Sequence, residues 1–166
     1  MGLRNHELDG PTFQMREKLF AIGDDSWIED STGNKAYKVN GKAVRFRDTF
    51  ILEDAYGAEV ARIQEKKLSV RSKMTIERGS AKAVVRKRLI GIRDRYMVDV
   101  KGGDDLKAKG NFVDHEYEIE RGGKKVAEIS KRWFRVRDTY GIQLAQGQDV
   151  ALILAITVCV DEMATG

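Results

Sequence analysis

The feature that most constrains the fold is an apolar run near the end of the chain, QDVALILAITVCVDEM, from Gln148 to Met163. Between Val150 and Val160 every residue except Thr157 is apolar, in a chain whose residues are 34% charged. A helix over this run would be hydrophobic on all sides, and each Leu or Ile left in water would forgo about 1.5 to 3 kcal/mol of burial. The rest of the chain must therefore fold around it.

Length and flanking residues favour a buried helix over a strand or a membrane span. As a helix the run is about 16 Å long, too short for a hydrocarbon core of about 30 Å. Strands usually have about five or six residues, so the length favours a helix, although the β-branched residues of the run weaken this preference. Asp149 stands at the N-cap position, where its side chain could accept a hydrogen bond from a free backbone N–H. We predict a helix from about 149 to 163. Its core residues are Val150, Leu152, Ile153, Leu154, Ile156, Val158, Cys159 and Val160.

The rest of the chain alternates apolar and polar residues in short segments separated by glycine, with 16 Gly and one Pro in total. The pairs Asn40-Gly41 and Gly122-Gly123 stand between two such segments and predict hairpin turns. About ten to twelve segments of this kind fit before the apolar run. This spacing is typical of an up-and-down β-barrel or a β-sandwich.

An internal repeat favours the barrel. A shift of 66 places (126 minus 60) aligns VARIQEKKLSVRSKMTI with VAEISKRWFRVRDTYGI, with six identities in 17 places and no gap. Two similar β halves that close on each other would leave no free strand edge, and the barrel could hold a helix at its centre. We therefore predict a mainly β fold, a closed antiparallel barrel of two pseudo-symmetric halves around the C-terminal helix. Asp149 and Asp161-Glu162, the polar ends of the helix, would lie at the two mouths.

Size and charge indicate one globular domain. The chain has 166 residues, and 30 Lys and Arg against 26 Asp and Glu give a net charge of +4. This charge is typical of a mixed-charge surface and also permits an anionic partner. The single cysteine cannot form an intramolecular disulfide, and we find no secretory signal, lipidation motif or transmembrane span. We expect a cytoplasmic protein.

The sequence shows no phosphate-binding glycine loop, nucleophile elbow or paired metal-ligand motif. The strands also lack the dense aromatic residues on which nucleic-acid bases stack. We therefore expect a non-enzymatic protein with no cofactor and no nucleic-acid partner.

Isolated residues of chemical interest are interpreted as structural. His115 lies between Asp114 and Glu116, and on a strand both acids would point to the opposite face, so we expect a surface or turn histidine rather than a metal ligand. Trp27 and Trp133 are expected to be packing anchors at the barrel wall. The cysteine of the apolar run is expected to be an inert core thiol.

Four segments carry a family resemblance: EISKRWF, RDTYGIQL and GQDVALILAITVCVDEM in the second half, and EKLFAIGDDSWIEDSTGNKAYKVNGKA near the start. They resemble the LURP-one-related family, which shares a fold superfamily with phospholipid scramblases and the Tubby C-terminal domain. The resemblance covers the chain from about Met15 to Met163. It implies a barrel of about twelve strands around a central helix, as one domain over 15–166 after an N-terminal extension over 1–14.

The same resemblance implies less about function. Tubby domains bind phosphoinositides, and scramblases are associated with calcium-dependent redistribution of lipids. The acidic segment of scramblases overlaps DTYGIQL here, where Asp138 and Asp149 remain but no acid lies between them. Calcium usually takes about six to eight oxygen ligands, so these two residues are only weak calcium candidates, and no metal site is expected.

Basic clusters on the predicted strands could hold an anionic headgroup at one end of the barrel, each residue contributing about 1 kcal/mol near an anionic membrane. The candidates are Lys66, Lys67, Arg71, Lys73, Lys131, Arg132, Arg135 and Arg137. Further basic residues occur at 86–88 and at 93 and 95. Such charges also cover the solvated face of many sheets. Two functions therefore stay open: a binding or scaffold module whose ligand or protein partner is unknown, and a peripheral module for anionic phospholipid or phosphoinositide headgroups at the inner membrane surface.

Overall fold

The structure is a computed structural model, and it describes residues 8–16, 26–40, 49–66, 73–90, 93–133 and 139–165. In these ranges the chain forms twelve β-strands and one α-helix. The strands are β1 (Thr12–Arg16), β2 (Ser26–Asp30), β3 (Lys35–Asn40), β4 (Thr49–Asp54), β5 (Glu59–Lys66), β6 (Lys73–Arg78), β7 (Ala81–Ile90), β8 (Arg93–Val100), β9 (Leu106–Asn111), β10 (Glu116–Arg121), β11 (Lys124–Ser130) and β12 (Thr139–Leu144). The helix is α1 (Val150–Thr165).

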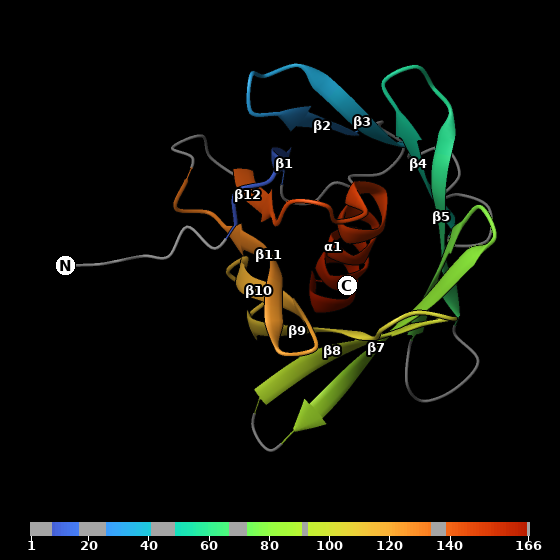
Figure 1. Ribbon diagram of the computed structural model, residues 1–166, viewed down its shortest axis with the longest axis vertical. Coiled ribbons are helices and arrows are strands. Elements are labelled where there is room, and N and C mark those ends of the chain that lie inside the picture. The colour runs from blue at the N-terminus through green and yellow to red at the C-terminus, as the bar shows by residue number, and fades with distance from the viewer. Residues whose placement is uncertain are drawn as a thin grey trace.

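The strands form a closed barrel (Figure 1). Each strand pairs antiparallel with its neighbours in sequence, and β1 pairs with β12 to close the sheet. Phe13 lies opposite Ile142 across this seam, and both side chains are buried. Closure removes the free edges that an open sheet would offer to other chains. The predicted closed antiparallel barrel of about twelve strands is confirmed.

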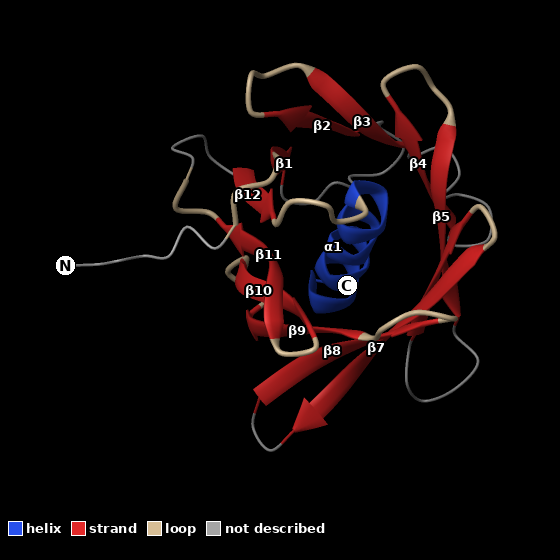
Figure 2. Cartoon of the chain, in the orientation of Figure 1, coloured by secondary structure: helices blue, strands red, loops and turns tan. Residues whose placement is uncertain are grey.

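Helix α1 runs through the middle of the barrel (Figure 2). It begins one residue later and ends two residues later than the predicted 149–163. The fully buried members of the predicted core are Ile153, Leu154, Ile156, Val158, Cys159 and Val160. Val150 and Leu152 are half-buried. The one polar residue of the run, Thr157, is buried too, and its hydroxyl donates a hydrogen bond to the Ile153 carbonyl one turn earlier (2.9 Å).

The internal repeat corresponds to strands on opposite sides of the barrel. Adding 66 to the bounds of β6 gives 139–144, which are the bounds of β12, and β5 corresponds to β11 within two residues. Ile63 pairs with Ile76 as Ile129 pairs with Ile142, and all four are buried. The corresponding strands are six places apart in a ring of twelve, so the two halves are pseudo-symmetric as predicted. The matches at 70 and 71 lie outside the described residues.

The two ends of the barrel differ. The turn end holds the tight turns after β2, β4, β6, β8 and β10 and the start of α1. Gly122 and Gly123 form the last of these turns with φ of 59° and 80°, a left-handed conformation that favours glycine, as the sequence predicts. The C-terminal rim holds the ends of β5, β7, β9 and β11 and the last turn of α1. The turn predicted at Asn40-Gly41 would lie at this rim, but positions 41–48 are outside the described residues.

The barrel begins earlier than expected from the sequence. β1 starts at Thr12, inside the stretch 1–14 that was expected to be an extension. Leu8 is buried, and its carbonyl accepts a hydrogen bond from the Gln143 side chain on β12. Positions 8–11 therefore pack against the barrel wall, and positions 12–14 are part of it.

Leu154 tests the packing of α1, because its side chain is completely buried. We expect Leu154→Ala to lower the free energy of unfolding by about 2–5 kcal/mol, since the truncation removes buried methyl groups and leaves a cavity. The control Tyr56→Ala, at a side chain that is 97% exposed, should change it by less than about 0.5 kcal/mol. Urea unfolding measures both values. A Leu154→Ala protein as stable as the control would contradict the central position of α1.

Cys159 gives an independent test, because burial raises the pKa of its thiol. A thiol attacks disulfide reagents only as the thiolate, so the folded protein holds Cys159 both protonated and inaccessible. We expect an aromatic disulfide reagent to modify it only through unfolding, at a rate that rises with urea in step with the unfolded fraction. Fast modification without urea would show that the barrel opens around α1.

Candidate functional site

Two lysines of the first predicted basic cluster meet on the outside of the barrel. Lys66, at the end of β5, lies directly opposite Lys73, at the start of β6. Met74 is fully buried, so the alternation of a strand places Lys73 on the outer face. The other two members of this cluster, Lys67 and Arg71, lie outside the described residues.

The row of cations continues onto two strands that the sequence prediction did not assign to the site. Arg86 of β7 lies opposite Lys73. Two residues nearer the rim, Arg88 lies opposite Arg95 of β8. Alternate residues of a strand share a face, so these arginines point outward with the lysines. We call the five residues the basic face: Lys66, Lys73, Arg86, Arg88 and Arg95.

A local charge count could have found this face in the sequence. The ten residues from Arg86 to Arg95 contain five basic residues and one acidic residue, a net charge of +4 (five minus one). The whole chain also carries +4, so the rest of the chain is neutral in sum. The strands β7 and β8 stay paired as far as Ile90 and Arg93, and their ends reach beyond the ring of the other strands (Figure 1). The excess charge of the protein is therefore concentrated on one projecting hairpin.

Like charges face each other directly on the basic face. Opposite residues of an antiparallel pair have Cβ atoms about 4.5–5.5 Å apart, and like charges at that distance are destabilising. Like charges also lie opposite each other at Arg121 and Lys124, but at two other places on the outer surface an opposite charge lies close by. Lys38 contacts Glu53 (3.2 Å), and where Glu118 lies opposite Glu128, Lys125 contacts both carboxylates (3.3 and 3.6 Å).

Acids near the basic face neutralise it only in part. Asp99 lies 3.7 Å from Arg86, and both side chains are more than half exposed. Asp94 lies 3.3 Å from Lys87, the neighbouring cation on the other face of β7. Exposed ion pairs of this kind contribute about 0–1 kcal/mol. The basic face therefore keeps a positive potential that could attract an anionic ligand.

The second predicted cluster lies at the same rim but on another side of the barrel. The backbone N–H of Lys131 donates a hydrogen bond to Glu116 (3.0 Å), and the Arg132 guanidinium lies 3.9 Å from the same carboxylate. Arg135 and Arg137 lie outside the described residues. Since β5 and β11 are six strands apart, the described members of the two clusters do not form one site.

Two adjoining hollows lie between the two basic regions. The first, of about 450 Å³, is lined by residues of β8, the β9–β10 turn and the end of α1, with Lys87 at its edge. The second, of about 430 Å³, reaches Arg132, and Arg95 and Gly110 line both. Gly110 has φ 137°, and a Cβ there would lie 2.6 Å from the Glu116 carbonyl, so only glycine fits between β9 and β10.

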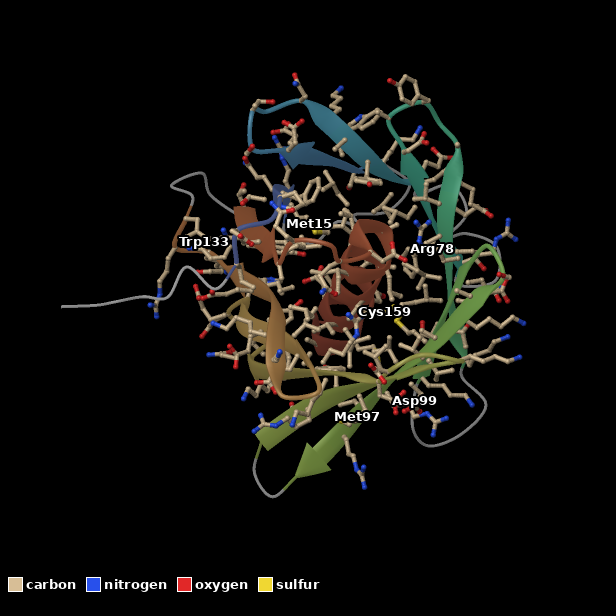
Figure 3. The ribbon with its side chains drawn as sticks, viewed as in Figure 1. Met15, Arg78, Met97, Asp99, Trp133 and Cys159 are labelled. Atoms are coloured by element: carbon tan, nitrogen blue, oxygen red, sulfur yellow. The ribbon has the colours of Figure 1, made fainter. Side chains whose placement is uncertain are left out.

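Of the two calcium candidates, the described residues include only Asp149. The Asp149 carboxylate accepts two hydrogen bonds from Arg78 Nε (2.9 and 2.8 Å) and one from the Leu152 backbone N–H (3.3 Å), which confirms the predicted N-cap. Arg78 projects from the barrel wall (Figure 3) and also donates to the Val60 carbonyl (3.1 Å). Asp138 lies outside the described residues. Within the described ranges, no group of three or more His, Cys, Asp and Glu side chains could hold a metal ion.

His115 lies in a turn, as one of its two predicted places, but it is buried and not at the surface. It lies in the β9–β10 turn with φ 51°, is only 3% exposed, and stacks on the Tyr140 ring with centroids 4.2 Å apart. Its Nε2 lies 3.4 Å from Asp161 of α1, which is buried rather than at an open mouth. Burial, and then the Asp161 charge, raise the pKa of Tyr117 in the same region. This polar cluster closes the C-terminal end of the core, and its burial keeps it from solutes.

The two tryptophans have different environments. Trp27 is half-buried, and the ammonium groups of Lys35 and Lys38 lie 4.7 and 5.5 Å from its ring centroid. Trp133 is 40% exposed on the outside of the barrel (Figure 3), so its prediction as a packing anchor is wrong.

Comparison with known protein families shows to which family this chain belongs. A family description, LURP-one-related, matches residues 11–161. The chain belongs to the LURP-one-related family. The match begins one residue before β1 and ends inside α1, so it spans the whole barrel and most of the helix.

Two known proteins are similar to this LURP-one-related chain, one in sequence and one in structure. "Uncharacterized protein YxjI" of Bacillus subtilis (strain 168) is 24% identical over 148 residues, which cover 89% of this chain and 90% of that protein. An X-ray structure of an Arabidopsis thaliana protein superposes with a TM-score of 0.69 at 18% identity, over 95% of this chain and 94% of that one. At this identity the likeness shows the fold alone. Among the described residues, no helix is both long and apolar enough to cross a membrane.

The contact between Arg78 and Asp149 fixes the start of α1 in this LURP-one-related barrel. We expect Asp149→Ala to lower the free energy of unfolding by about 1–2 kcal/mol, because it removes the N-cap and a partly exposed ion pair. Asp149→Ser should cost less, since serine keeps the cap and loses only the pair. A double-mutant cycle with Arg78→Ala, measured by urea unfolding, should give a coupling of about 0.5–1 kcal/mol. A coupling of zero would show that the pair does not hold the helix.

Proposed function

We propose that this protein is a non-enzymatic binding module and that the basic face binds the headgroups of anionic phospholipids. The observation that carries the proposal is the direct opposition of like charges at Lys66–Lys73, Lys73–Arg86 and Arg88–Arg95. A fold under selection for stability alone would place acids among these cations, as it does around Lys125. A multivalent anionic ligand removes the repulsion when it binds.

The filled interior supports a binding role over an enzymatic one. Enzyme sites need a concave pocket with polar groups that converge on the substrate. Here α1 fills the barrel, and the buried cluster around His115 and Asp161 is shut off from solvent. The chemistry that remains accessible is the charged outer surface and the rim, which suit the recognition of a charged partner.

A lipid bilayer fits the size and charge of the basic face better than a small anion does. The five cations span four adjacent strands, β5 to β8, so they cover an area wider than one phosphate group. Each Lys or Arg near an anionic membrane contributes about 1 kcal/mol, and this attraction falls off within a Debye length. We therefore expect salt-sensitive binding. A scaffold role with a protein partner, the second function, needs no response to lipid charge.

Charge reversal on β7 tests the proposal. Arg86→Glu with Arg88→Glu reverses two exposed cations of the basic face. The matched control is Lys82→Glu with Lys101→Glu, at exposed positions of the same hairpin but at the turn end. Each double variant lowers the net charge by four, from +4 to zero. We expect the first variant to lose at least about thirtyfold in affinity for anionic vesicles, and the control to stay within about threefold.

Co-sedimentation with vesicles measures these affinities. Phosphatidylcholine vesicles with and without phosphatidylglycerol or a phosphoinositide are compared at low and physiological salt, with and without calcium. An equal loss in both variants would show that net charge, and not the basic face, governs binding. No binding of the unchanged protein under any condition would overturn the lipid proposal and direct the search to protein partners.

A further inference from the structure

Large hydrophobic side chains are unevenly exposed in the described part of the barrel. Three are exposed: Tyr56 (97%), Val113 (70%) and Trp133 (40%). Tyr56 lies in the β4–β5 turn, at the turn end. Val113 lies in the β9–β10 turn and Trp133 follows β11, so both lie at the C-terminal rim. Single exposed hydrophobic residues are common in proteins. Val113 and Trp133 are of interest because charged residues lie close to both of them.

Cations lie near both rim residues. Val113 lines the same hollow as Lys87 and Arg95, together with Ala164 in the last turn of α1. Trp133 follows Arg132, whose side chain is 81% exposed. The adjoining hollows, which share Arg95, connect the two regions into one arc across β8, the β9–β10 turn and the end of β11. The charged residues that line this arc are balanced, with four basic and four acidic side chains, and Arg95 of the basic face is one of them.

Two acidic residues of this region interact with neighbouring side chains. Asp94 contacts Lys87 (3.3 Å), and Asp114 accepts a hydrogen bond from the Asn111 side chain (2.7 Å). The Lys87 ammonium partly compensates the charge of Asp94, whereas the neutral Asn111 amide orients Asp114 without compensating its charge. An apolar residue next to a cation is the arrangement that binds the interface of an anionic membrane, where apolar groups enter below the headgroups and cations stay among them. Tryptophan in particular prefers this depth.

We infer that the barrel docks end-on, with the C-terminal rim against the bilayer and with Val113 and Trp133 inserted among the headgroups. This inference rests on the proposed lipid function and adds to it an orientation and two insertion residues. The hairpin of β7 and β8 flanks the inserted residues, so the basic face contacts headgroups at the edge of the same footprint. Helix α1 then directs its C-terminal end towards the membrane, and the turn end with Tyr56 faces away from it.

Fluorescence quenching tests the orientation, because the chain contains only two tryptophans. In the first protein, Trp27→Phe leaves Trp133 as the only tryptophan. In the matched control, Trp27→Phe, Trp133→Phe and Tyr56→Trp place the only tryptophan at the opposite end. Both are mixed with phosphatidylglycerol vesicles that contain lipids brominated near the headgroup or deep in the acyl chain. We expect shallow bromine to quench Trp133 at least about twofold more than deep bromine, and the tryptophan at position 56 to stay unquenched.

Binding of insertion variants gives the second readout. We expect Val113→Ser and Trp133→Ser each to weaken binding to anionic vesicles by about threefold to tenfold without changing its salt dependence, and Tyr56→Ser to have no effect. Vesicle binding without quenching of Trp133, or with equal quenching at position 56, would overturn the end-on orientation and leave the lipid function standing. No vesicle binding by any of the proteins would overturn the lipid function itself, and the orientation with it.

Discussion

The whole structure depends on the need to surround a helix that has no polar face. An α-helix satisfies its own backbone hydrogen bonds, so the barrel wall has to supply only apolar contacts along most of its length. Unpaired groups remain only at the two ends of such a helix. At one end Asp149 caps α1 and Arg78 holds Asp149, and at the other Asp161 meets His115. The barrel closes around the helix because an open sheet would leave one side of it in water.

Because α1 fills the barrel, the surface that a binding partner can reach is the outer surface. Larger barrels can bind ligands in their lumen, but here side chains of α1 and of twelve strands fill the interior. The tight turns and the helix start occupy the turn end. The outer face near the C-terminal rim is free of both. The cations of β5 to β8 lie in this region.

Much of the fold could be predicted from the sequence because local patterns determine it. The length of the apolar run, the N-cap at Asp149 and the 66-residue repeat each depend on residues close together or on simple self-similarity, and each is confirmed. The candidate site was harder because it depends on strand register. Lys73 and Arg86 are 13 positions apart, and a shift of one residue between β6 and β7 would point one of them inward. The burial of His115 depends on a left-handed turn and on α1, which no local pattern indicates.

The pseudo-symmetry of the barrel shows that the fold itself does not require the basic face. The junction of β6 with β7 corresponds to the junction of β12 with β1, since each joins one half of the barrel to the other. At the first junction Lys73 lies opposite Arg86, whereas at the second its counterpart Thr139 (73 plus 66) lies opposite Arg16. The same strand pairing is therefore built once with two cations and once with a cation and a neutral residue. Because only one of the two junctions carries opposed cations, barrel closure does not require them.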